Sequence, residues 1–394
     1  MSIGALAFRT AGRLVYGKGT TSQVGELLGG GSGAKHTVLV VTDAMMVQLG
    51  LVDKALDALT AAGHKVEVYD EIYPDPSEES IYAATAAGRK AGCDAVVGFG
   101  GGSPMDAAKL VAFLLKTERP APALEGMWGV HAELPGGRTP LALIPTTAGT
   151  GSEVTPLSII TTTAGPKLGL SSPTLLPDVA ILDSSLTMSV PPAVTAATGI
   201  DAMVHAIEAY TSRLQKNQIS DALAKDALKL LAGSIHGAVE NGAEDEEARS
   251  NMLLGSCMAG MAFAHAPVAA VHALAYPIGV DFGVPHGYSN ALVLPHVLRF
   301  NSAAAAPLYA ELAPICFPTM DASRDAAAVS AEFAERYADL SDELGLEMGL
   351  RAVGVTAEDV EKLANDAMLQ QRLLPNNPRE VTLDDARALY TAAL

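Results

Sequence analysis

The first 185 residues alternate short runs of aliphatic and β-branched residues with longer stretches whose apolar positions recur at helical spacing. The runs predict strands and the stretches between them predict helices. The expected strands lie at 37–43, 65–70, 94–100, 140–147 and 178–183, and the expected helices at 51–63, about 78–91 and about 103–115. This alternation predicts right-handed βαβ units, and hence a parallel, Rossmann-like sheet with helices on both faces.

After residues 189–199 the β-branched runs almost stop, and Ala/Leu-rich helical periodicity continues to the end of the chain. The double proline Pro191–Pro192 interrupts a strand or helix, so the domain boundary is expected close to it. A chain of 394 residues is also long enough for two domains. We therefore expect an α/β domain over residues 1–190 and an all-α domain over residues 191–394.

One segment calls for a test against a membrane span. Residues 250–280 contain no Asp, Glu, Lys or Arg and are long enough to cross a bilayer. Two histidines, Pro267, Pro277 and the lack of a flanking basic cluster favour a buried core helix instead. No membrane association is expected.

Charge and cysteine usage exclude several classes of partner. The formal net charge of −18 and the absence of basic clusters disfavour nucleic acid and anionic membrane as partners. Three scattered cysteines without CxxC spacing are typical of a reducing compartment. The N-terminal residues lack the apolar run of a signal peptide, so a cytoplasmic location is expected.

A glycine-rich turn, "GFGGGSPMDAAK" (98–109), leaves an apolar strand and opens a helix. Gly100, Gly101 and Gly102 would let backbone N–H groups approach a ligand without a Cβ in the way. The helix expected to start near Ser103, with Pro104 as its first residue, would offer its N-terminus to a pyrophosphate. A plain strand-to-helix turn is the alternative, although three glycines cost entropy that such a turn does not require.

A second turn, "PTTAGTGSEVT" (145–155), follows another apolar strand. Two such loops at the carboxyl ends of parallel strands would flank one nucleotide-binding crevice. Asp43 ends the first strand and could accept hydrogen bonds from an adenosine ribose diol. Its carboxylate would repel a 2′-phosphate, which favours NAD over NADP. A simple helix or turn cap is the alternative for Asp43.

Acidic and histidine side chains recur at helical spacing in the second half. Asp201 and His205 are four residues apart, which places both on one face of a helix. His265, His272 and Tyr276 follow at spacings of seven and four, which also predicts a single helical face. A histidine taken singly is more often structural than a ligand, and a lone Asp–His pair at this spacing is more often a surface or capping pair than a metal site.

His286 lies in a "VPHG" turn that is expected to open the next helix. Together with Asp201, His205 and His272 it gives three nitrogens and one oxygen. Such a set suits Fe(II) or Zn(II) and leaves positions open for a substrate oxygen. The combination with a nucleotide crevice favours a metal site over isolated structural residues.

These motifs resemble the iron-containing (group III) alcohol dehydrogenase family over nearly the whole chain. The motifs are "GGGSPMDAAK", "PTTAGTGSEVT", "LLPDVAILD", "GIDAMVHAIEAY" and "HALAYPIG…VPHGYSNALVLPHVLRFN". The resemblance implies an N-terminal nucleotide-binding domain, a C-terminal helical domain and an active site in the cleft between them. It also implies NAD as cofactor, Fe2+ (or Zn2+) as metal and a homodimer.

The resemblance carries roles to individual residues. The implied metal ligands are Asp201, His205, His272 and His286. The implied cofactor residues are Gly100, Gly101, Gly102, Ser103 and Asp106 in the pyrophosphate loop, Thr146, Thr147 and Ser152 in the second loop, and Lys167, where the family often has a basic residue.

Tyr276 departs from the family pattern, because many members have histidine four residues after the third ligand. A tyrosine has an ordinary pKa of about 10 and is a weaker base at neutral pH. His265 is a candidate substitute in proton transfer or a substrate contact; a core histidine bonded to backbone is the alternative.

The expected function is metal-dependent hydride transfer between NAD(H) and a small alcohol or aldehyde, or a hydroxy or oxo acid. Two relatives in the superfamily are alternatives: a maleylacetate reductase-like enzyme and a lyase similar to dehydroquinate synthase. The scarcity of Arg and Lys in the motifs disfavours the lyase, whose substrate is phosphorylated. A non-catalytic NAD- or metal-binding regulator is a third hypothesis, disfavoured by the complete ligand set.

Overall fold

The computed structural model describes residues 7–28, 33–117, 124–163 and 167–394. They form two compact units. The first comprises Met1–Thr147 and Gly151–Thr187, and the second comprises Ala148–Thr150 and Met188–Leu394. Ala148–Thr150, in the turn after the strand Leu141–Pro145, therefore belong to the helical unit.

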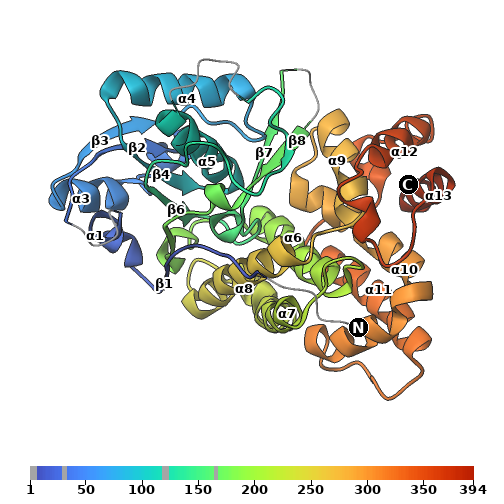
Figure 1. Cartoon of the computed structure of the whole chain (residues 1–394). Helices are drawn as coiled ribbons and strands as arrows, with labels where there is room; N and C mark the ends of the chain where they lie inside the picture. The colour runs from blue at the N-terminus through green and yellow to red at the C-terminus, as the bar shows by residue number, and fades with distance from the viewer. Residues whose placement is uncertain (1–6, 29–32, 118–123, 164–166) are drawn as a thin grey trace. The chain divides into compact units, whose positions relative to one another are not determined.

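A six-stranded sheet, parallel throughout, forms the centre of the first unit (Figure 1). In spatial order its strands are β1 (Leu14–Tyr16), β9 (Val179–Leu182), β6 (Leu141–Pro145), β4 (Ala95–Gly100), β2 (Thr37–Val41) and β3 (Lys65–Tyr69). The predicted parallel α/β sheet is confirmed.

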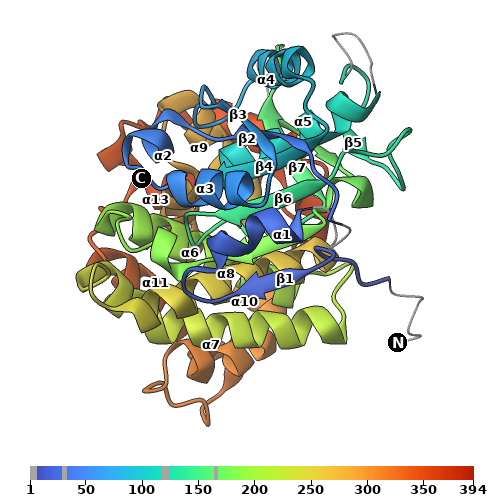
Figure 2. The same ribbon diagram turned by 90° about the vertical axis from the view of Figure 1, so that its left-hand side faces the viewer.

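The four inner strands of the sheet are buried on both faces, and their successive side chains point to opposite sides. In β2, Leu39 and Val41 join one hydrophobic cluster while Val38 and Val40 join the other. Helices α4 and α5 contribute to the first cluster, and α1 and α3 to the second (Figure 2). The helices of this unit are α1 (Val24–Leu27), α2 (Ala44–Gln48), α3 (Asp53–Ala61), α4 (Glu78–Ala91) and α5 (Gly102–Thr117).

Four short strands go beyond the predictions. They are β1 of the main sheet and the strands of a separate three-stranded sheet, β5 (Gly129–Val130), β8 (Lys167–Ser171) and β7 (Leu157–Thr161). β7 and β8 pair as an antiparallel hairpin. β1 has only three residues and two of them are exposed, so it carries no buried apolar run that a sequence pattern could reveal.

The second unit is entirely helical in its described residues, as predicted. Its helices are α6 (Pro192–Thr211), α7 (Gln218–Glu240), α8 (Glu246–His265), α9 (Ala270–Phe282), α10 (His286–Cys316), α11 (Ala326–Glu343), α12 (Val360–Met368) and α13 (Leu383–Ala393). Short 3₁₀ helices complete the two units: η1 (Thr20–Gln23), η2 (Ser152–Val154), η3 (Pro173–Leu175), η4 (Ser184–Leu186), η5 (Leu350–Val353) and η6 (Leu374–Asn376). The double proline begins α6, with Pro191 as its N-cap, because proline suits the first turn of a helix.

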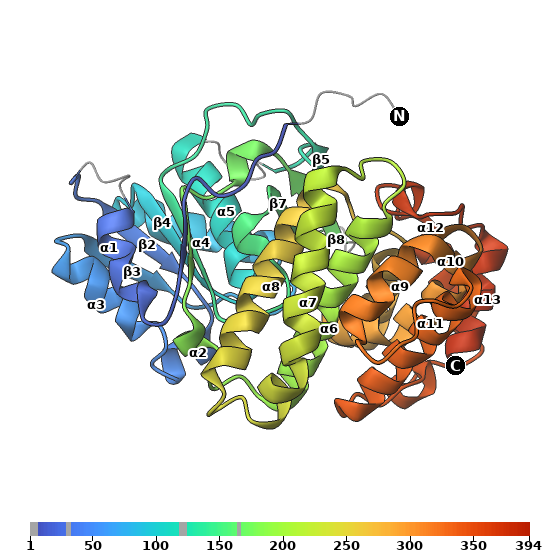
Figure 3. The ribbon, with the colours of Figure 1, turned by 90° about the horizontal axis from the view of Figure 1, so that it is seen from below.

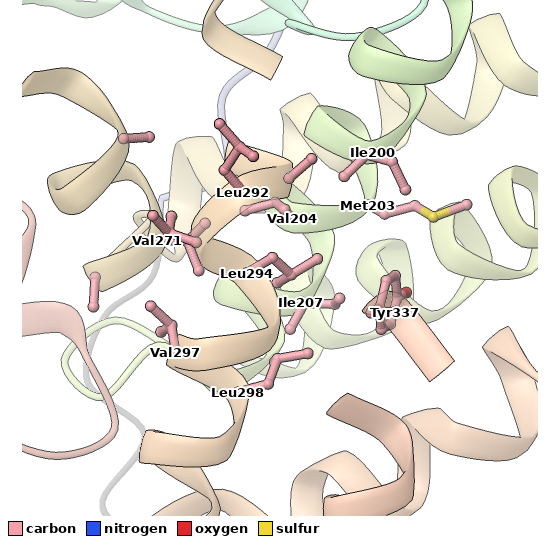
Figure 4. Close-up of a cluster of buried hydrophobic side chains, with 14 of the residues drawn as sticks. Ile200, Met203, Val204, Ile207, Val271, Leu292, Leu294, Val297, Leu298 and Tyr337 are labelled. Atoms are coloured by element: carbon pink, nitrogen blue, oxygen red, sulfur yellow. The ribbon is translucent and has the colours of Figure 1, made fainter. Parts of the chain in front are cut away.

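Helix α6 is the central helix of this unit. It is buried along most of its length and packs against α7, α8 and α10 (Figure 3). The shared core contains Ile200, Met203, Val204 and Ile207 of α6 and Leu292, Leu294, Val297 and Leu298 of α10 (Figure 4). Polar side chains on α6 are therefore held in a rigid, apolar setting.

The uncharged run at residues 250–280 is two helices, so the prediction of one buried helix is wrong. α8 ends at His265 and α9 begins at Ala270, with a bend of 108° between them. Pro267 explains the break, because it lacks an N–H and disfavours helical geometry in the residue before it. In the described ranges no single helix is long and apolar enough to cross a membrane; the bent pair passes that test by length and composition only.

Candidate active site

Three ionisable side chains line one face of the otherwise apolar helix α6. Asp201, His205 and Glu208 follow one another at spacings of four and three residues, which brings them onto one side of the helix. All three are buried. Burying such groups is costly unless each finds a partner, so this face indicates a functional site.

Two histidines from other helices meet this face. His272 lies in the first turn of α9, and His286 is the first residue of α10, as the turn before it predicts. Asp201 Oδ1 lies 3.8 Å from His205 Nε2, 3.7 Å from His272 Nε2 and 3.6 Å from His286 Nε2. One ligand atom from each of the four residues lies within 4.8 Å of the others. Metal–ligand bonds of about 2.1 Å place tetrahedral ligand atoms about 3.4 Å apart, so a divalent ion fits this set with little rearrangement.

Hydrogen bonds on the far side of two rings select the tautomer that a metal needs. His272 Nδ1 donates to Glu208 Oε2 at 2.7 Å. His205 Nδ1 lies 3.2 Å from the backbone oxygen of Gly149, to which it can donate. Each bond leaves the Nε2 lone pair facing the cluster. Carboxylate or carbonyl partners of this kind orient metal-binding histidines.

Burial keeps His205 in its neutral form. Desolvation lowers the pKa of His205 well below its ordinary value, and the nearby His272 lowers it further, whereas the Gly149 carbonyl opposes the shift. Its ring also stacks on Phe263, with centroids 4.4 Å apart. A neutral imidazole held in one orientation is a ready metal ligand.

Glu208 is a member of the site that the sequence patterns do not identify. Its carboxylate accepts hydrogen bonds from the backbone N–H of Ala269 (3.0 Å) and Val271 (2.7 Å), besides the bond from His272. It therefore caps the N-terminus of α9 and fixes the ring of His272 at the same time. The sequence offers one signal for this role: Glu208 is an acidic residue among apolar neighbours on its helix.

Tyr276 lies beside the cluster, but His265 does not share its helix. The Tyr276 ring is 5.6 Å from the ring of His286 and edge-on to that of His272 at 6.5 Å. His265 is the last residue of α8, and its Nδ1 bonds the Met261 oxygen at 2.9 Å. The predicted single face for His265, His272 and Tyr276 is wrong, because α8 and α9 are separate helices.

In the first unit, the glycine turn links β4 to α5. Gly100 has φ +141°, and a Cβ there would lie 2.8 Å from Pro104 Cγ, so glycine is required. α5 begins at Gly102, which makes Pro104 its third residue and not its first. Ser103 Oγ accepts a hydrogen bond from the Asp75 N–H at 3.3 Å. Gly101 lies between β4 and the helix, where backbone N–H groups become available to a ligand.

The second loop runs directly beside the first, because β4 and β6 are neighbours in the sheet. The Thr146 N–H donates to the Gly100 oxygen at 2.9 Å. The Thr147 hydroxyl lies 3.6 Å from the point where a Gly101 Cβ would be. The structure thus brings the two predicted loops together at the carboxyl ends of adjacent parallel strands.

Asp106 and Ser152 bind each other. Ser152 Oγ donates to Asp106 Oδ1 at 2.5 Å, and the Ile159 N–H donates to Asp106 Oδ2 at 2.9 Å. Lys109, which is fully buried, donates to Ser152 Oγ at 2.7 Å and to the Leu157 oxygen at 2.6 Å. Burial lowers the pKa of Lys109, and the Asp106 carboxylate opposes that shift. This network, which we call the Lys109 network (Asp106, Lys109, Ser152 and the Leu157 oxygen), holds the loops to α5.

Asp43 and Lys167 border the glycine turn without entering it. Asp43 Oδ1 accepts from the Met46 N–H at 3.1 Å, so it caps α2. Its Oδ2 lies 3.3 Å from the position of a Cβ on Gly100. Lys167 Nζ pairs with Asp75 Oδ1 at 2.6 Å, next to the Asp75 N–H that binds Ser103.

Two family models together match nearly the whole chain. The iron-containing alcohol dehydrogenase model matches residues 11–184, and the model of the C-terminal part of the Fe-containing alcohol dehydrogenase family matches residues 195–394. The chain belongs to the iron-containing alcohol dehydrogenase family. Membership makes this dehydrogenase an oxidoreductase and rules against a non-catalytic regulator.

Full-length relatives agree with this assignment. The long-chain-alcohol dehydrogenase 1 of Geobacillus thermodenitrificans (strain NG80-2) is 40% identical over 373 residues, which cover 92% of this chain and 90% of the relative. A crystal structure of a 1,3-propanediol oxidoreductase matches with 33% identity and a TM-score of 0.91, over 99% of this chain and 100% of that chain. Sulfoacetaldehyde reductase from Bifidobacterium kashiwanohense, solved with NAD+, matches with 31% identity and a TM-score of 0.86, over 99% of each chain.

The role of Glu208 leads to a first prediction. We expect Glu208→Gln to weaken binding of a divalent metal by the dehydrogenase by about 10–100-fold. A glutamine side chain has one acceptor oxygen and one NH2 donor in place of two acceptor oxygens. It therefore cannot accept from His272 Nδ1 and from both α9 N–H groups at once. Competition with a chelator of known affinity measures the change.

The matched control is Glu240→Gln, at the exposed end of α7. It makes the same chemical change away from the cluster and should leave the affinity for metal unchanged. Equal metal affinity of Glu208→Gln and the unmodified enzyme would show that the Glu208–His272 bond has no part in the metal centre.

Proposed function

We propose that this dehydrogenase interconverts a small, uncharged alcohol and its aldehyde by hydride transfer with NAD(H), at a site that holds Fe2+ or, as the alternative, Zn2+. One observation carries the proposal: four ligand atoms from α6, α9 and α10 converge within 4.8 Å of one another. Two of the imidazoles are held with Nε2 toward the cluster.

Asp201, His205, His272 and His286 would hold the metal. The donor set fits a divalent ion, because one carboxylate and three imidazoles are ligands that Fe(II) and Zn(II) both accept. When bound, such an ion supplies a Lewis acid that lowers the pKa of an alcohol hydroxyl. His286 is the most exposed of the four, with 34% of its side chain accessible, so it marks the side from which substrate can approach.

The glycine loops would bind the cofactor. Gly100, Gly101 and Gly102 expose backbone N–H groups at the start of α5, where a pyrophosphate is stabilised by the helix N-terminus. Thr146 and Thr147 line the neighbouring loop, and Ser103 lies in the first turn of α5. Asp106 and Ser152 would act indirectly, because their side chains bind each other. The related sulfoacetaldehyde reductase was solved with NAD+, which supports NAD as the cofactor.

Asp43 and Lys167 would also belong to the cofactor site, Asp43 by direct contact and Lys167 through its neighbours. The cap that Asp43 forms uses Oδ1, while Oδ2 faces Gly100 and can accept from a ribose diol. A carboxylate at this place disfavours a 2′-phosphate, which supports NAD over NADP. Lys167 would lie near the cofactor through Asp75 and Ser103.

The surroundings of the ligand histidines favour an uncharged substrate. Phe263 stacks on His205, and the Tyr276 ring lies against His286. Aromatic rings exclude water and suit the carbon chain of an alcohol. Two of the relatives named above are named for uncharged alcohols and the sulfoacetaldehyde reductase for an anionic substrate, so the aromatic lining, and not the relatives, carries the preference for an uncharged substrate.

The enzyme's activity can be tested directly. Metal is removed from the purified dehydrogenase with a chelator, Fe2+ or Zn2+ is restored under anaerobic conditions, and NADH absorbance is followed with a panel of alcohols and aldehydes. We expect metal-dependent NADH formation and consumption, with NADP(H) much less effective. A lyase would convert its substrate without a net change in NADH, and activity only with maleylacetate would favour the reductase alternative.

The proton route can be separated with two variants. Tyr276 is next to His286, so we expect Tyr276→Phe to change the pH–rate profile; His265 bonds the Met261 oxygen, so we expect His265→Ala to leave the profile unchanged. A shift in His265→Ala with none in Tyr276→Phe would reverse the assignment. Unchanged profiles in both variants would remove both residues from proton transfer.

A homodimer and a cytoplasmic location complete the proposal. The dimer rests on the family resemblance, and light scattering of the purified enzyme tests it. The location is supported by the cysteines Cys93, Cys257 and Cys316, which are buried and form no disulfide, as suits a reducing compartment.

A further inference from the structure

Asn290 is a fully buried asparagine on α10, one helical turn after His286. Its Nδ2 donates to Asp201 Oδ1 at 2.7 Å. The same nitrogen lies 3.4 Å from His272 Nε2 and 3.3 Å from His286 Nε2. The amide therefore contacts the ligand atoms of three of the four candidate metal ligands.

The bond to Asp201 decides which way the amide faces. A carboxylate oxygen only accepts, so the NH2 end and not the carbonyl end must point at Asp201. Asn290 Oδ1 is left buried with no hydrogen-bond partner among the described residues. A buried, unsatisfied oxygen is costly in a native protein and calls for a functional reason.

Glycine permits this contact between the helices. A Cβ on Gly287 would lie 2.2 Å from the Ala197 oxygen and 3.2 Å from Asp201 Cβ. The first turn of α10 therefore approaches the backbone of α6 as closely as a residue without a side chain allows. This approach brings Asn290 within hydrogen-bond distance of Asp201.

Asp201 needs such a donor to present one oxygen to the cluster. Its Oδ1 is the atom that lies 3.6–3.8 Å from the three histidine Nε2 atoms. With Nδ1 as the donor on their far sides, His205 and His272 offer lone pairs, not protons, toward this oxygen. Asn290 is the hydrogen-bond donor that the described structure gives to Asp201.

We propose that Asn290 is a positioning residue of the metal centre, whose amide N–H holds the Asp201 carboxylate in the orientation in which Oδ1 faces the metal. The inference rests on the proposed metal site and adds to it a residue that acts through Asp201. Without the amide, rotation of the carboxylate would move Oδ1 away from the point that the three Nε2 atoms share.

The test measures metal binding directly. Co2+ is titrated into the metal-free Asn290→Ala and Asn290→Ser proteins in competition with a chelator, and its visible absorption spectrum is recorded. Serine ends one bond nearer the backbone, so its hydroxyl does not reach Asp201, and it serves as a second variant where alanine fails to fold. We expect both variants to bind Co2+ about 10–100-fold more weakly, with a changed spectrum.

Asn301→Ala is the matched control. Asn301 is buried on the same helix and bonds the side chain of Asn377, away from the cluster. It should lower thermal stability but leave the affinity for Co2+ and the spectrum unchanged. A merely structural role for Asn290 predicts the same behaviour for its own variants.

A double variant tests whether Asn290 acts through Asp201. In an Asp201→Ala background, adding Asn290→Ala should change the residual Co2+ affinity by less than twofold. The inference is wrong if Asn290→Ala and Asn290→Ser match the unmodified protein in affinity and spectrum. Failure of the unmodified protein to bind Co2+ would instead overturn the proposed metal site itself.

Discussion

Asp201→Ala is expected to weaken metal binding so far that the purified enzyme retains little metal, and to lower kcat/KM for alcohol oxidation by about 10³-fold or more. Asp201 is the one anionic member of the ligand set, so its loss leaves three neutral imidazoles facing a dication. Lewis-acid catalysis by a bound ion supplies several kcal/mol of transition-state stabilisation, and about 4 kcal/mol corresponds to a factor of 10³. Metal content and the initial rate of NADH formation measure the two effects.

Asp281→Ala is the control for this prediction. Asp281 is exposed near the end of α9 and pairs with Lys362 on the surface, where an ion pair contributes about 0–1 kcal/mol. It should retain its metal and its activity. His272→Ala should behave like Asp201→Ala, because it removes the ligand that Glu208 orients. An Asp201→Ala enzyme that keeps both metal and activity would reject the ligand assignment.

Elements with strong local patterns could be predicted from the sequence. The strands β2, β4, β6 and β9 coincide with apolar runs, because a parallel sheet covered on both faces needs continuous hydrophobic strands; the edge strand β3 alternates charged and apolar residues instead. Helix α4 spans the predicted residues 78–91, between the N-cap Ser77 and the left-handed Gly92. The hairpin of β7 and β8 was not predicted, because each strand has only five residues and buries at most two of them.

The residues of the candidate site likewise divide into those that local spacing could predict and those that it could not. Spacing could place Asp201 and His205 on one face, because both lie on one uninterrupted helix. The same reasoning failed for His265, because a spacing of seven indicates one face only where the helix is continuous, and Pro267 ends it. Hydrophobic periodicity does not reveal a break between two helices. The proline does reveal it, provided that it is taken as stronger evidence than the continuous apolar run.

Residues that act through distant partners lay outside the reach of sequence patterns. Glu208 binds the start of α9, and Asn290 on α10 binds Asp201 on α6. In the sequence, Lys109 cannot be told from any other lysine on a helix. Its role depends on the Leu157 oxygen, to which it donates a hydrogen bond in the folded chain. In each case the role of the side chain depends on a tertiary contact, which a single sequence does not reveal.

Lys109→Met is expected to lower the free energy of unfolding of the dehydrogenase by about 3–5 kcal/mol and to raise KM for NAD. Methionine keeps much of the chain length but removes the charge, so the Asp106 carboxylate loses its cationic partner. Removing one member of a buried ion pair costs about this much. Loss of the bonds to Ser152 and the Leu157 oxygen also frees the second loop from α5. Urea unfolding and steady-state kinetics with varied NAD measure the two effects.

Lys116→Met makes the same change at an exposed position of the same helix and should alter neither quantity. The double variant Asp106→Asn/Lys109→Met should recover part of the lost stability, because it leaves no unpaired charge behind. Equal losses in the single and double variants would show that the energy resides in the packing of the lysine chain and not in its charge. A Lys109→Met enzyme with unchanged KM for NAD would show that the Lys109 network supports the fold of the first unit but does not set the geometry of the cofactor loops.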